Sequence, residues 1–228
     1  MMKLVRVRVN QFLETWKTEG LSSVMKKAFF LHKEIIPAEK DLSLLPALKF
    51  SPKTSEIRFV EISPDYLMNK KFRYALKNRH LRVSKNFKKG YRGFAIIRGD
   101  EIVGDIWYCT REGSDRIYAH PDLEWLEWVD IRLGPKDAYL FEMYVKTQER
   151  GGGIVNFMLW NALNSLKEKG FSRAYGYCTA DNIPALWVHR ILGYKELERI
   201  KMHRILSATR RSIKGDNPRA LFRIFDLS

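Results

Sequence analysis

The sequence is poor in cysteine, poor in acidic residues, and without a long apolar run. Its two cysteines, Cys109 and Cys178, lie far apart among 228 residues, which excludes a disulfide framework and a paired-cysteine metal site. They suit a reducing cytosol, so we expect a cytoplasmic protein. No stretch approaches the roughly 18 consecutive apolar residues that a membrane-spanning helix needs. Charges run through residues 1–20, and we therefore expect no secretory signal.

The shortage of acidic residues gives the chain a strong charge. There are 41 Lys and Arg against 26 Asp and Glu, so the formal net charge is +15 and the pI is near 9.8. A field of this sign attracts anions, whether nucleic acid, acidic lipid or acidic small molecules. Nucleic acid is disfavoured because no sequence-reading motif accompanies the charge.

What is present is ample material for a folded core. Hydrophobic residues make up 45% of the chain and aromatic residues 13%, which argues against wholesale disorder. Helical and strand patterns alternate along the chain, which predicts an α/β fold with a mixed sheet. The expected strands are 56–62, a 91–111 hairpin turning at Gly99-Asp100, 138–145, 172–180, 194–206 and 221–226, and the expected helices are 63–89, 154–170 and 182–193.

The first fifty residues read as a separate helical extension. An apolar stripe at helical spacing runs from Leu21 to Ile35, basic residues lie off it, and Pro37 is expected to end the helix. The linker 43–56 would then join this extension, residues 1–50, to a main domain, residues 51–228. The apolar stripe suits packing on the main domain or on a second copy, and its basic flank also suits an anionic membrane surface.

A triple glycine stands between an apolar strand and a helix in "YVKTQERGGGIV", residues 144–155. The first turn of a helix has N–H groups without internal partners, and glycines let an anion approach them without obstruction by a Cβ atom. We interpret the segment as a pyrophosphate-binding turn, with a tight turn that binds nothing as the alternative. A Walker A loop is excluded because no Gly-Lys-Ser/Thr follows, and Asn156 fits a dinucleotide fingerprint badly.

Two spaced motifs then resemble one known family. Gln148-Glu149-Arg150-Gly151-Gly152-Gly153 matches Gln/Arg-x-x-Gly-x-Gly/Ala, and Asn182, Ala185 and Gly193-Tyr194 match the ending "N-x-x-A…G-[FY]". Over residues 55–206 the chain resembles the GNAT (GCN5-related N-acetyltransferase) superfamily. The resemblance implies a mixed, mostly antiparallel sheet flanked by helices. It also implies an N-acyltransferase that uses acetyl-CoA or another acyl-CoA as co-substrate, without a metal.

The same resemblance implies roles for individual residues. Met143, Tyr144 and Val145 would pair their backbone with pantetheine where the strand splays from its neighbour. The motif that starts at Gln148 would present the N–H groups of Arg150, Gly151, Gly152, Gly153 and Ile154 to the pyrophosphate, while Asn182 and Ala185 would lie beside the pantetheine arm. Acyl transfer would proceed by direct attack of an amine, which suits a chain with no nucleophile elbow and no evident Cys/His pair.

Two residues are candidates for proton transfer. Glu142 lies in the apolar strand before the glycine motif, where many family members carry a carboxylate that acts as a base, and the alternative is an ion pair with a neighbouring Arg or Lys. His189 stands where the family often has a tyrosine acid, seven residues after Asn182. Imidazole can donate a proton near neutral pH, and the alternative is an ordinary half-buried histidine beside an apolar stripe.

A basic tract lies in the region that borders the acceptor entrance in this family. Between Tyr66 and Gly99 there are eleven Lys and Arg and no Asp or Glu. The tract suits an acidic acceptor, an acyl carrier protein or an anionic surface, and the alternative is a solvated helix face. The main hypothesis is therefore an N-acyltransferase with an acidic or carrier-bound amine acceptor. The competing hypotheses are an N-acyl amino acid synthase using long-chain donors and a module that binds CoA or an anionic surface without chemistry.

Overall fold

The structure is a computed structural model that describes residues 30–47, 56–63, 72–74, 76–111, 126, 131–205, 208–213 and 223–224. The chain divides into two compact units. One comprises Met1–Ile36, Thr179–Asp181 and Glu198–Ser228, and the other comprises Pro37–Cys178 and Asn182–Leu197. This division does not fall at residue 50, where we expected the extension to end, because residues 37–47 belong to the larger unit.

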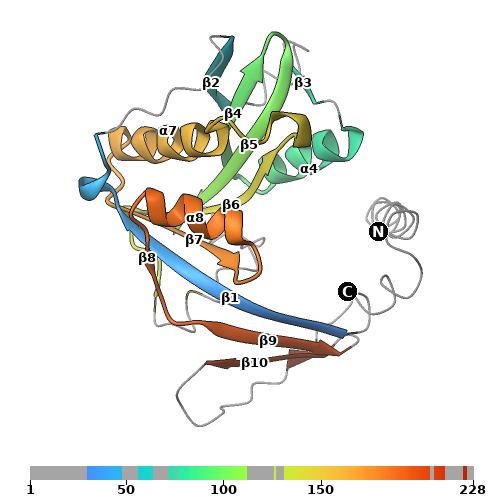
Figure 1. The fold of residues 1–228 in the computed structure, drawn as a ribbon, viewed down its shortest axis with the longest axis vertical. Coiled ribbons are helices and arrows are strands. Elements are labelled where there is room, and N and C mark those ends of the chain that lie inside the picture. The colour runs from blue at the N-terminus through green and yellow to red at the C-terminus, as the bar shows by residue number, and fades with distance from the viewer. Residues whose placement is uncertain are drawn as a thin grey trace. The chain divides into compact units, whose positions relative to one another are not determined.

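The larger unit is built on a mixed sheet (Figure 1). The strand order is β1-β7-β6-β5-β4-β2, and the ladders β2–β4, β4–β5 and β5–β6 are antiparallel whereas β6–β7 is parallel. The mostly antiparallel mixed sheet is therefore confirmed. The strands are β1 (Phe30–Asp41), β2 (Ile57–Ile62), β4 (Arg92–Arg98), β5 (Glu101–Thr110), β6 (Asp137–Val145) and β7 (Arg173–Thr179), with short β3 (Arg73–Tyr74) beside β5 and β8 (Lys195–Glu196) beside β1.

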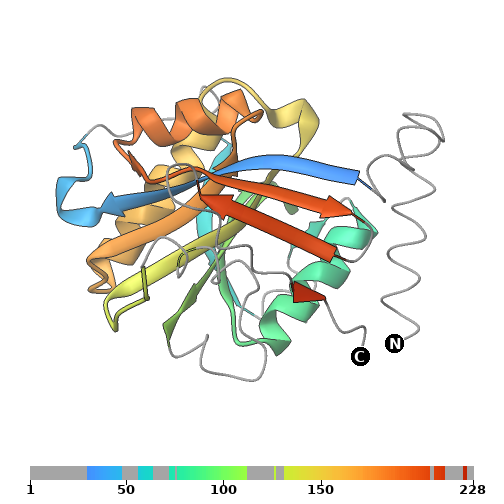
Figure 2. The same ribbon diagram turned by 90° about the horizontal axis from the view of Figure 1, so that it is seen from below.

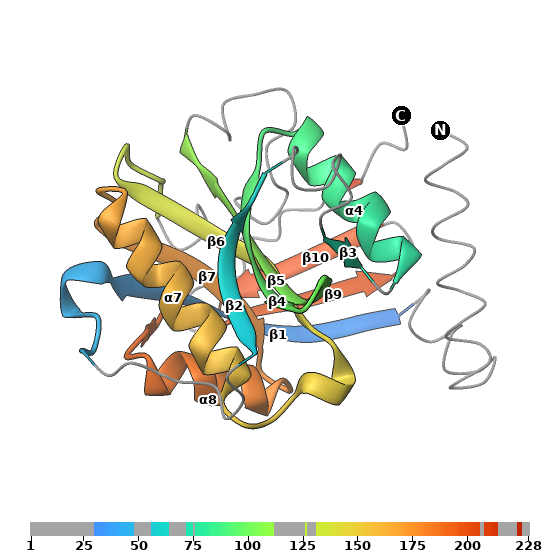
Figure 3. The same ribbon diagram turned by 90° about the horizontal axis from the view of Figure 1, so that it is seen from above.

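Each face of this sheet packs its own hydrophobic cluster, because successive strand residues point to opposite sides. Phe94 and Ile96 of β4 join the cluster beneath helix α7 (Ile154–Glu168). Helix α8 (Ile183–Ile191) packs Val188 against this cluster, and the segment after α8 adds Leu192 and Tyr194 to it. Ala95 and Ile97 join the cluster beneath helix α4 (Lys77–Lys88). Figure 3 shows α7 and α4 on opposite sides of β4 and β5.

The expected helix boundaries hold at α7 and α8. Gly170 follows α7 with φ +87°, and Gly193 follows α8 with φ +70°, the left-handed values that favour glycine at a helix end. Asn182 caps α8 through a hydrogen bond from the Ala185 N–H to its Oδ1 at 3.3 Å. The hairpin β4–β5 also turns where expected, at Gly99 with φ +59°.

The prediction of a helix that ends at Pro37 is wrong from Phe30 onward. Phe30–Asp41 is the strand β1, which pairs antiparallel with β9 (Ile200–Ile205) and then with β8. Pro37 lies between these two partners, where its carbonyl accepts from the Leu197 N–H at 2.8 Å and its missing N–H removes at most one hydrogen bond. Partners more than 150 residues away determine this strand. The apolar stripe from Leu21 to Ala28 lies outside the described residues.

The predicted helix 63–89 is shorter than expected. It begins at Lys77, after β3, and residues 64–71 lie outside the described part. The linker 43–56 contains the end of a short 3-10 helix, η1 (Leu42–Leu44). The smaller unit has β1, β9, β10 (Ala208–Ile213) and β11 (Arg223–Ile224) as an antiparallel set, in which β9 lies between β1 and β10 (Figure 2). β10 was not predicted.

Candidate functional site

A bulge near the end of β6 shapes the candidate site. Trp107 pairs with Phe141, but Asp105 pairs with Tyr144, so the ladder gains one residue on β6 between these two pairs. Glu142 lies in this bulge with φ +52°, the one positive φ among the non-glycine residues described. A left-handed conformation costs an ordinary residue about 1–2 kcal/mol, so other contacts must maintain it. The bulge therefore interrupts the regular alternation of side chains between the two faces of β6 at Glu142.

The last part of β6 separates from β7. The parallel ladder joins only Asp137, Ala138 and Tyr139 to β7. Beyond Tyr139, no pairing of β6 with β7 is present among the described residues. On the other side the ladder with β5 continues to Val145, where Gly104 permits close approach: a Cβ there would lie 3.1 Å from the Tyr144 carbonyl oxygen. One backbone edge of β6 is thus left without a strand partner.

The glycine turn continues directly from this open strand end. After η2 (Thr147–Glu149), Gly151, Gly152 and Gly153 have φ of +108°, +54° and +79°, and α7 begins at Ile154. A Cβ added to Gly151 or Gly153 would meet no atom within 4 Å. These glycines are therefore required by backbone conformation, and the space beside them is open.

The N–H groups of the turn show which of them could hold an anion. The Arg150 N–H donates to Thr147 O at 3.2 Å and the Ile154 N–H donates to Gly151 O at 3.2 Å. Within the described residues, five other N–H groups here donate no hydrogen bond: those of Gly151, Gly152, Gly153, Val155 and Asn156. The turn therefore fits a diphosphate, and the free donors extend two residues further into α7 than the motif indicated.

Other residues of the motif stabilise the turn. The Arg150 Nε donates to the carbonyl oxygen of Val145 at 3.1 Å, and Glu149 pairs with Arg98 at 2.8 Å. Gln148 is exposed, and Met143 and Val145 pack against the cluster under α7. The side chain of Asn182 is occupied in capping α8, where it accepts from Ala185.

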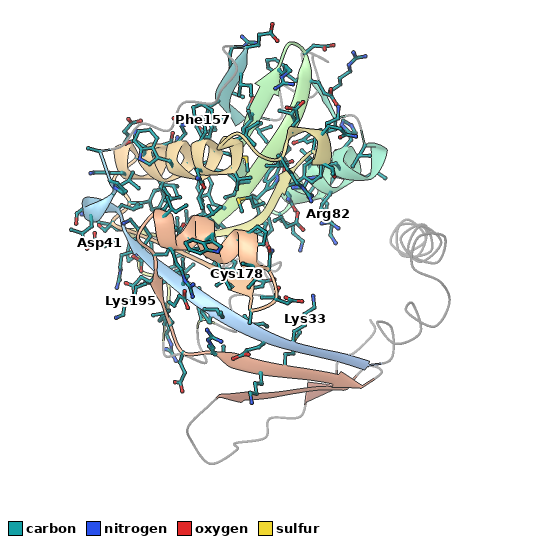
Figure 4. The ribbon with its side chains drawn as sticks, in the orientation of Figure 1. Lys33, Asp41, Arg82, Phe157, Cys178 and Lys195 are labelled. Atoms are coloured by element: carbon teal, nitrogen blue, oxygen red, sulfur yellow. The ribbon has the colours of Figure 1, made fainter. Side chains whose placement is uncertain are left out.

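Glu142 is surrounded by basic and polar side chains of α4. Its carboxylate lies 3.5 Å from Arg82 and 3.9 Å from Arg79, and Asn86 Nδ2 donates to it at 3.3 Å. The side chain of Glu142 is 28% exposed to solvent. The ion pair that we weighed against a base is thus present, and Arg82, labelled in Figure 4, extends from α4 toward this carboxylate.

Arg79 lies beneath this cluster and is paired with Asp105. Its Nε donates to both carboxylate oxygens of Asp105 at 3.1 Å, and its Nη2 contacts one of them as well. Asp105 is fully buried, and burial raises the pKa of its carboxyl group while the bonds and charge of Arg79 oppose that rise. Removing one partner of such a pair costs about 3–5 kcal/mol.

His189 lies in the interior rather than on an open surface. It is 8% exposed, its ring stacks on Tyr194 with centroids 4.6 Å apart, and its Nδ1 finds no hydrogen-bond partner among the described residues. Burial lowers the pKa of His189 to about 4. At neutral pH the imidazole is therefore uncharged, which favours the packing interpretation over the general-acid hypothesis.

Sequence reasoning missed the residues that support Glu142. Arg79, Arg82 and Asn86 were noticed only as part of a basic tract or not at all. Asp105 had a usable signal, because a carboxylate inside the apolar run "IVGDIWY" must find a partner. That partner lies 26 positions earlier, and its identity could not be read from spacing.

Neither a metal-binding cluster nor a membrane-spanning helix is present among the described residues. No group of three or more His, Cys, Asp or Glu side chains in the described ranges is placed to hold a metal ion. No helix in the same part of the chain is both long and apolar enough to span a bilayer. The anion-compatible turn and the charged cluster at Glu142 remain as the candidate site.

Comparison with solved structures shows the same fold. A GCN5-related N-acetyltransferase from Sphaerobacter thermophilus aligns with a TM-score of 0.50 and 13% identity, over 84% of this chain and 55% of that one. A GCN5-related glucosamine N-acetyltransferase region of a fungal multi-domain GH3 β-N-acetylglucosaminidase aligns with a TM-score of 0.52 and 18% identity, over 80% of this chain and 22% of that one. The chain thus spans about half or less of these proteins. No curated protein matches it.

The family profile connects the sequence to this fold. The profile of the acetyltransferase (GNAT) family matches residues 57–194, which is more than half of the chain and runs from β2 through α8. Both spaced motifs and the bulged strand lie inside that range. The chain therefore belongs to the acetyltransferase (GNAT) family.

Proposed function

We propose that this protein transfers an acetyl group from acetyl-CoA to the amine of an acidic acceptor. The observation that carries the proposal is the turn of three left-handed glycines, with free N–H groups, at the start of α7. Backbone donors at a helix start favour a diphosphate. The open edge of β6, from Met143 to Val145, would offer backbone groups to the pantetheine arm.

The chemistry requires no covalent enzyme intermediate. The amine nitrogen of the acceptor attacks the thioester carbonyl carbon, forming the C–N bond and losing a proton, while the C–S bond breaks and the departing CoA thiolate takes up a proton. The amine must be uncharged when it attacks, so it either binds in its neutral form or loses a proton first. The protein contributes by binding the two substrates so that the amine faces the thioester carbon. It also fixes the charged side chains around Glu142 in place.

The acidic nature of the acceptor is supported by the charge around Glu142. Arg79 is matched by Asp105, whereas Arg82 lies 3.5 Å from the carboxylate of Glu142, and the charge of Glu142 also acts on Lys89. Lys85 adds a further exposed positive charge on α4. This excess favours an amine that carries a carboxylate or lies on an acidic carrier. Cys109 and Cys178 are buried and not joined in a disulfide, which supports a cytoplasmic setting.

A charge placed in the glycine turn tests the coenzyme site. In Gly153→Asp, a carboxylate would occupy the space for the diphosphate, and we expect the affinity for acetyl-CoA to fall about a hundredfold or more, ~3 kcal/mol. The matched control is Gly170→Asp at the other end of α7, which has φ +87° and equally open space. Asp tolerates the left-handed region at a similar cost in both variants.

Binding is measured by calorimetry, and turnover by thiol release from acetyl-CoA across a panel of neutral, basic and acidic amines. Equal affinity in Gly153→Asp and Gly170→Asp would contradict the coenzyme site. Tight binding without turnover on any amine would indicate instead a module that binds CoA, and turnover only with long-chain donors would indicate an N-acyl amino acid synthase.

A further inference from the structure

Arg79 contacts the strand bulge on both of its flanks. Its Nη2 donates to the carbonyl oxygen of Glu142 at 2.8 Å, and its Cζ lies 5.0 Å from the centroid of the Tyr144 ring. The same guanidinium binds Asp105, which stands directly opposite Tyr144 in the β5–β6 ladder. One side chain from α4 therefore joins β5 to the bulged part of β6.

We propose that Arg79, fixed by Asp105, is a positioning residue that holds the bulge of β6 and so sets the register of the coenzyme-facing strand end. The effect on coenzyme binding rests on the proposed function. The claim that Arg79 stabilises the bulge does not.

The fork geometry of arginine explains why this residue type is needed. The bulge places the carbonyl of Glu142 where the guanidinium of Arg79 reaches it, and Glu142 itself is kept at φ +52°. A guanidinium presents several donors in one plane, so Arg79 can satisfy Asp105 and this carbonyl together. A lysine ammonium could not reach both with comparable geometry.

Stability alone does not account for the pair. A buried ion pair is often replaced by apolar residues without loss of stability, and α4 already packs on the sheet through Val83 and through Phe87, whose ring meets Trp107 edge-on at 5.1 Å. What apolar residues could not supply is a donor to the Glu142 carbonyl. Without it, a shift of β6 by one residue would exchange the faces of Met143, Tyr144 and Val145.

The test compares two double variants. Arg79→Met/Asp105→Leu removes both charges together and replaces them with apolar side chains, so no unpaired charge stays buried while the donor to Glu142 is lost. Arg173→Met/Asp137→Leu is the matched control, since Asp137 is a buried carboxylate bound by Arg173 through two bonds of 3.0 Å at the opposite end of β6. Arg79→Lys adds a conservative variant that keeps the charge and loses the fork.

The first readout is hydrogen exchange of the β6 backbone amides without ligand. In Arg79→Met/Asp105→Leu the amides of residues 142–145 should exchange at least about tenfold faster, with residues 137–139 unchanged. In Arg173→Met/Asp137→Leu the amides of residues 137–139 should exchange faster, with residues 142–145 unchanged. Unchanged exchange at residues 142–145 would overturn the proposal.

The second readout is affinity and turnover with acetyl-CoA. We expect KM for acetyl-CoA to rise and kcat to fall, together by about a hundredfold in kcat/KM, with Arg79→Lys in between and the control pair close to the starting protein. If hydrogen exchange at residues 142–145 becomes faster while kcat/KM stays constant, the proposal that the bulge positions the coenzyme is overturned. If the unaltered protein fails to bind acetyl-CoA, the proposed function fails, and the exchange measurement still decides whether Arg79 holds the bulge.

Discussion

His189 and Tyr194 stack face to face in the interior, with ring centroids 4.6 Å apart and an angle of 29° between the ring planes. Burial lowers the pKa of His189 to about 4 from its ordinary 6.5. The unfolded chain therefore takes up a proton between pH 6.5 and 4 that the folded protein does not, and the free energy of unfolding decreases as the pH falls through that window. The full loss would approach about 3 kcal/mol.

His189→Phe should remove this acid sensitivity, because phenylalanine can stack on Tyr194 and does not titrate. Denaturant unfolding at pH 7 and pH 4.5 measures the effect, and His80→Phe on the exposed side of α4 is the control. We expect kcat at pH 7 to change less than about threefold, since neutral imidazole is a poor proton donor. A fall of a hundredfold at constant KM for acetyl-CoA would restore the general-acid hypothesis.

Glu142→Gln distinguishes an ion pair from a general base. The amide would keep the backbone contact with Arg79 and lose the charge facing Arg82, so we expect a loss of stability of about 1 kcal/mol and a fall in kcat of less than about tenfold. General bases usually contribute 10² to 10⁴. Steady-state kinetics over pH 6–9 separate the two cases.

The control for that variant is Glu101→Gln. Glu101 pairs with Lys146 at 2.8 Å and has the same 28% side-chain exposure as Glu142. A kcat reduced more than a hundredfold in Glu142→Gln alone would contradict the ion-pair interpretation.

Arg82→Glu tests the acidic acceptor. The side chain of Arg82 is 43% exposed beside Glu142, and reversing its charge should raise KM for an acidic amine about tenfold while KM for acetyl-CoA stays constant. Arg73→Glu makes the same charge change at a 75% exposed position paired with Asp100. Equal effects of the two variants would show that only net charge matters, and no effect of either would contradict an acidic acceptor.

Lys40→Met tests a buried connection between η1 and α8. The Nζ of Lys40 donates to Leu44 O at 2.9 Å and to Gly193 O at 3.3 Å, and the residue is 3% exposed. Loss of this donor leaves two carbonyls poorly satisfied, so we expect a loss of about 1–3 kcal/mol in the free energy of unfolding. Thermal unfolding measures it, with exposed Lys195→Met as the control. A melting temperature equal to that of the control would contradict the connection.

Local patterns predicted the elements whose partners are close in the sequence. The β4–β5 hairpin, α7 with Gly170 and α8 with its Asn182 cap follow from turn and capping chemistry, which acts within a few residues. Strand β1 was predicted as helix because Leu31 and Ile35 fit a helical stripe, while the strands that pair with it lie near the other end of the chain. Spacing could not reveal such a partner.

The candidate site was predictable to a similar extent. The glycine turn is contiguous, so its motif carried the prediction of a diphosphate site. The bulge at Glu142 and its support by Arg79 and Asp105 come from three separate elements and have no local signature. The placement of His189 against Tyr194 depends on how the chain turns after α8, which apolar spacing does not specify.

The short ladder between β6 and β7 has a practical consequence for handling the protein. An unpaired strand edge is a template on which a second chain can add, and edge-to-edge addition leads to aggregation. If pantetheine covers that edge in solution, CoA should protect the protein during purification and storage as well as take part in turnover. Light scattering during prolonged incubation, with and without CoA, would then show slower particle growth in its presence.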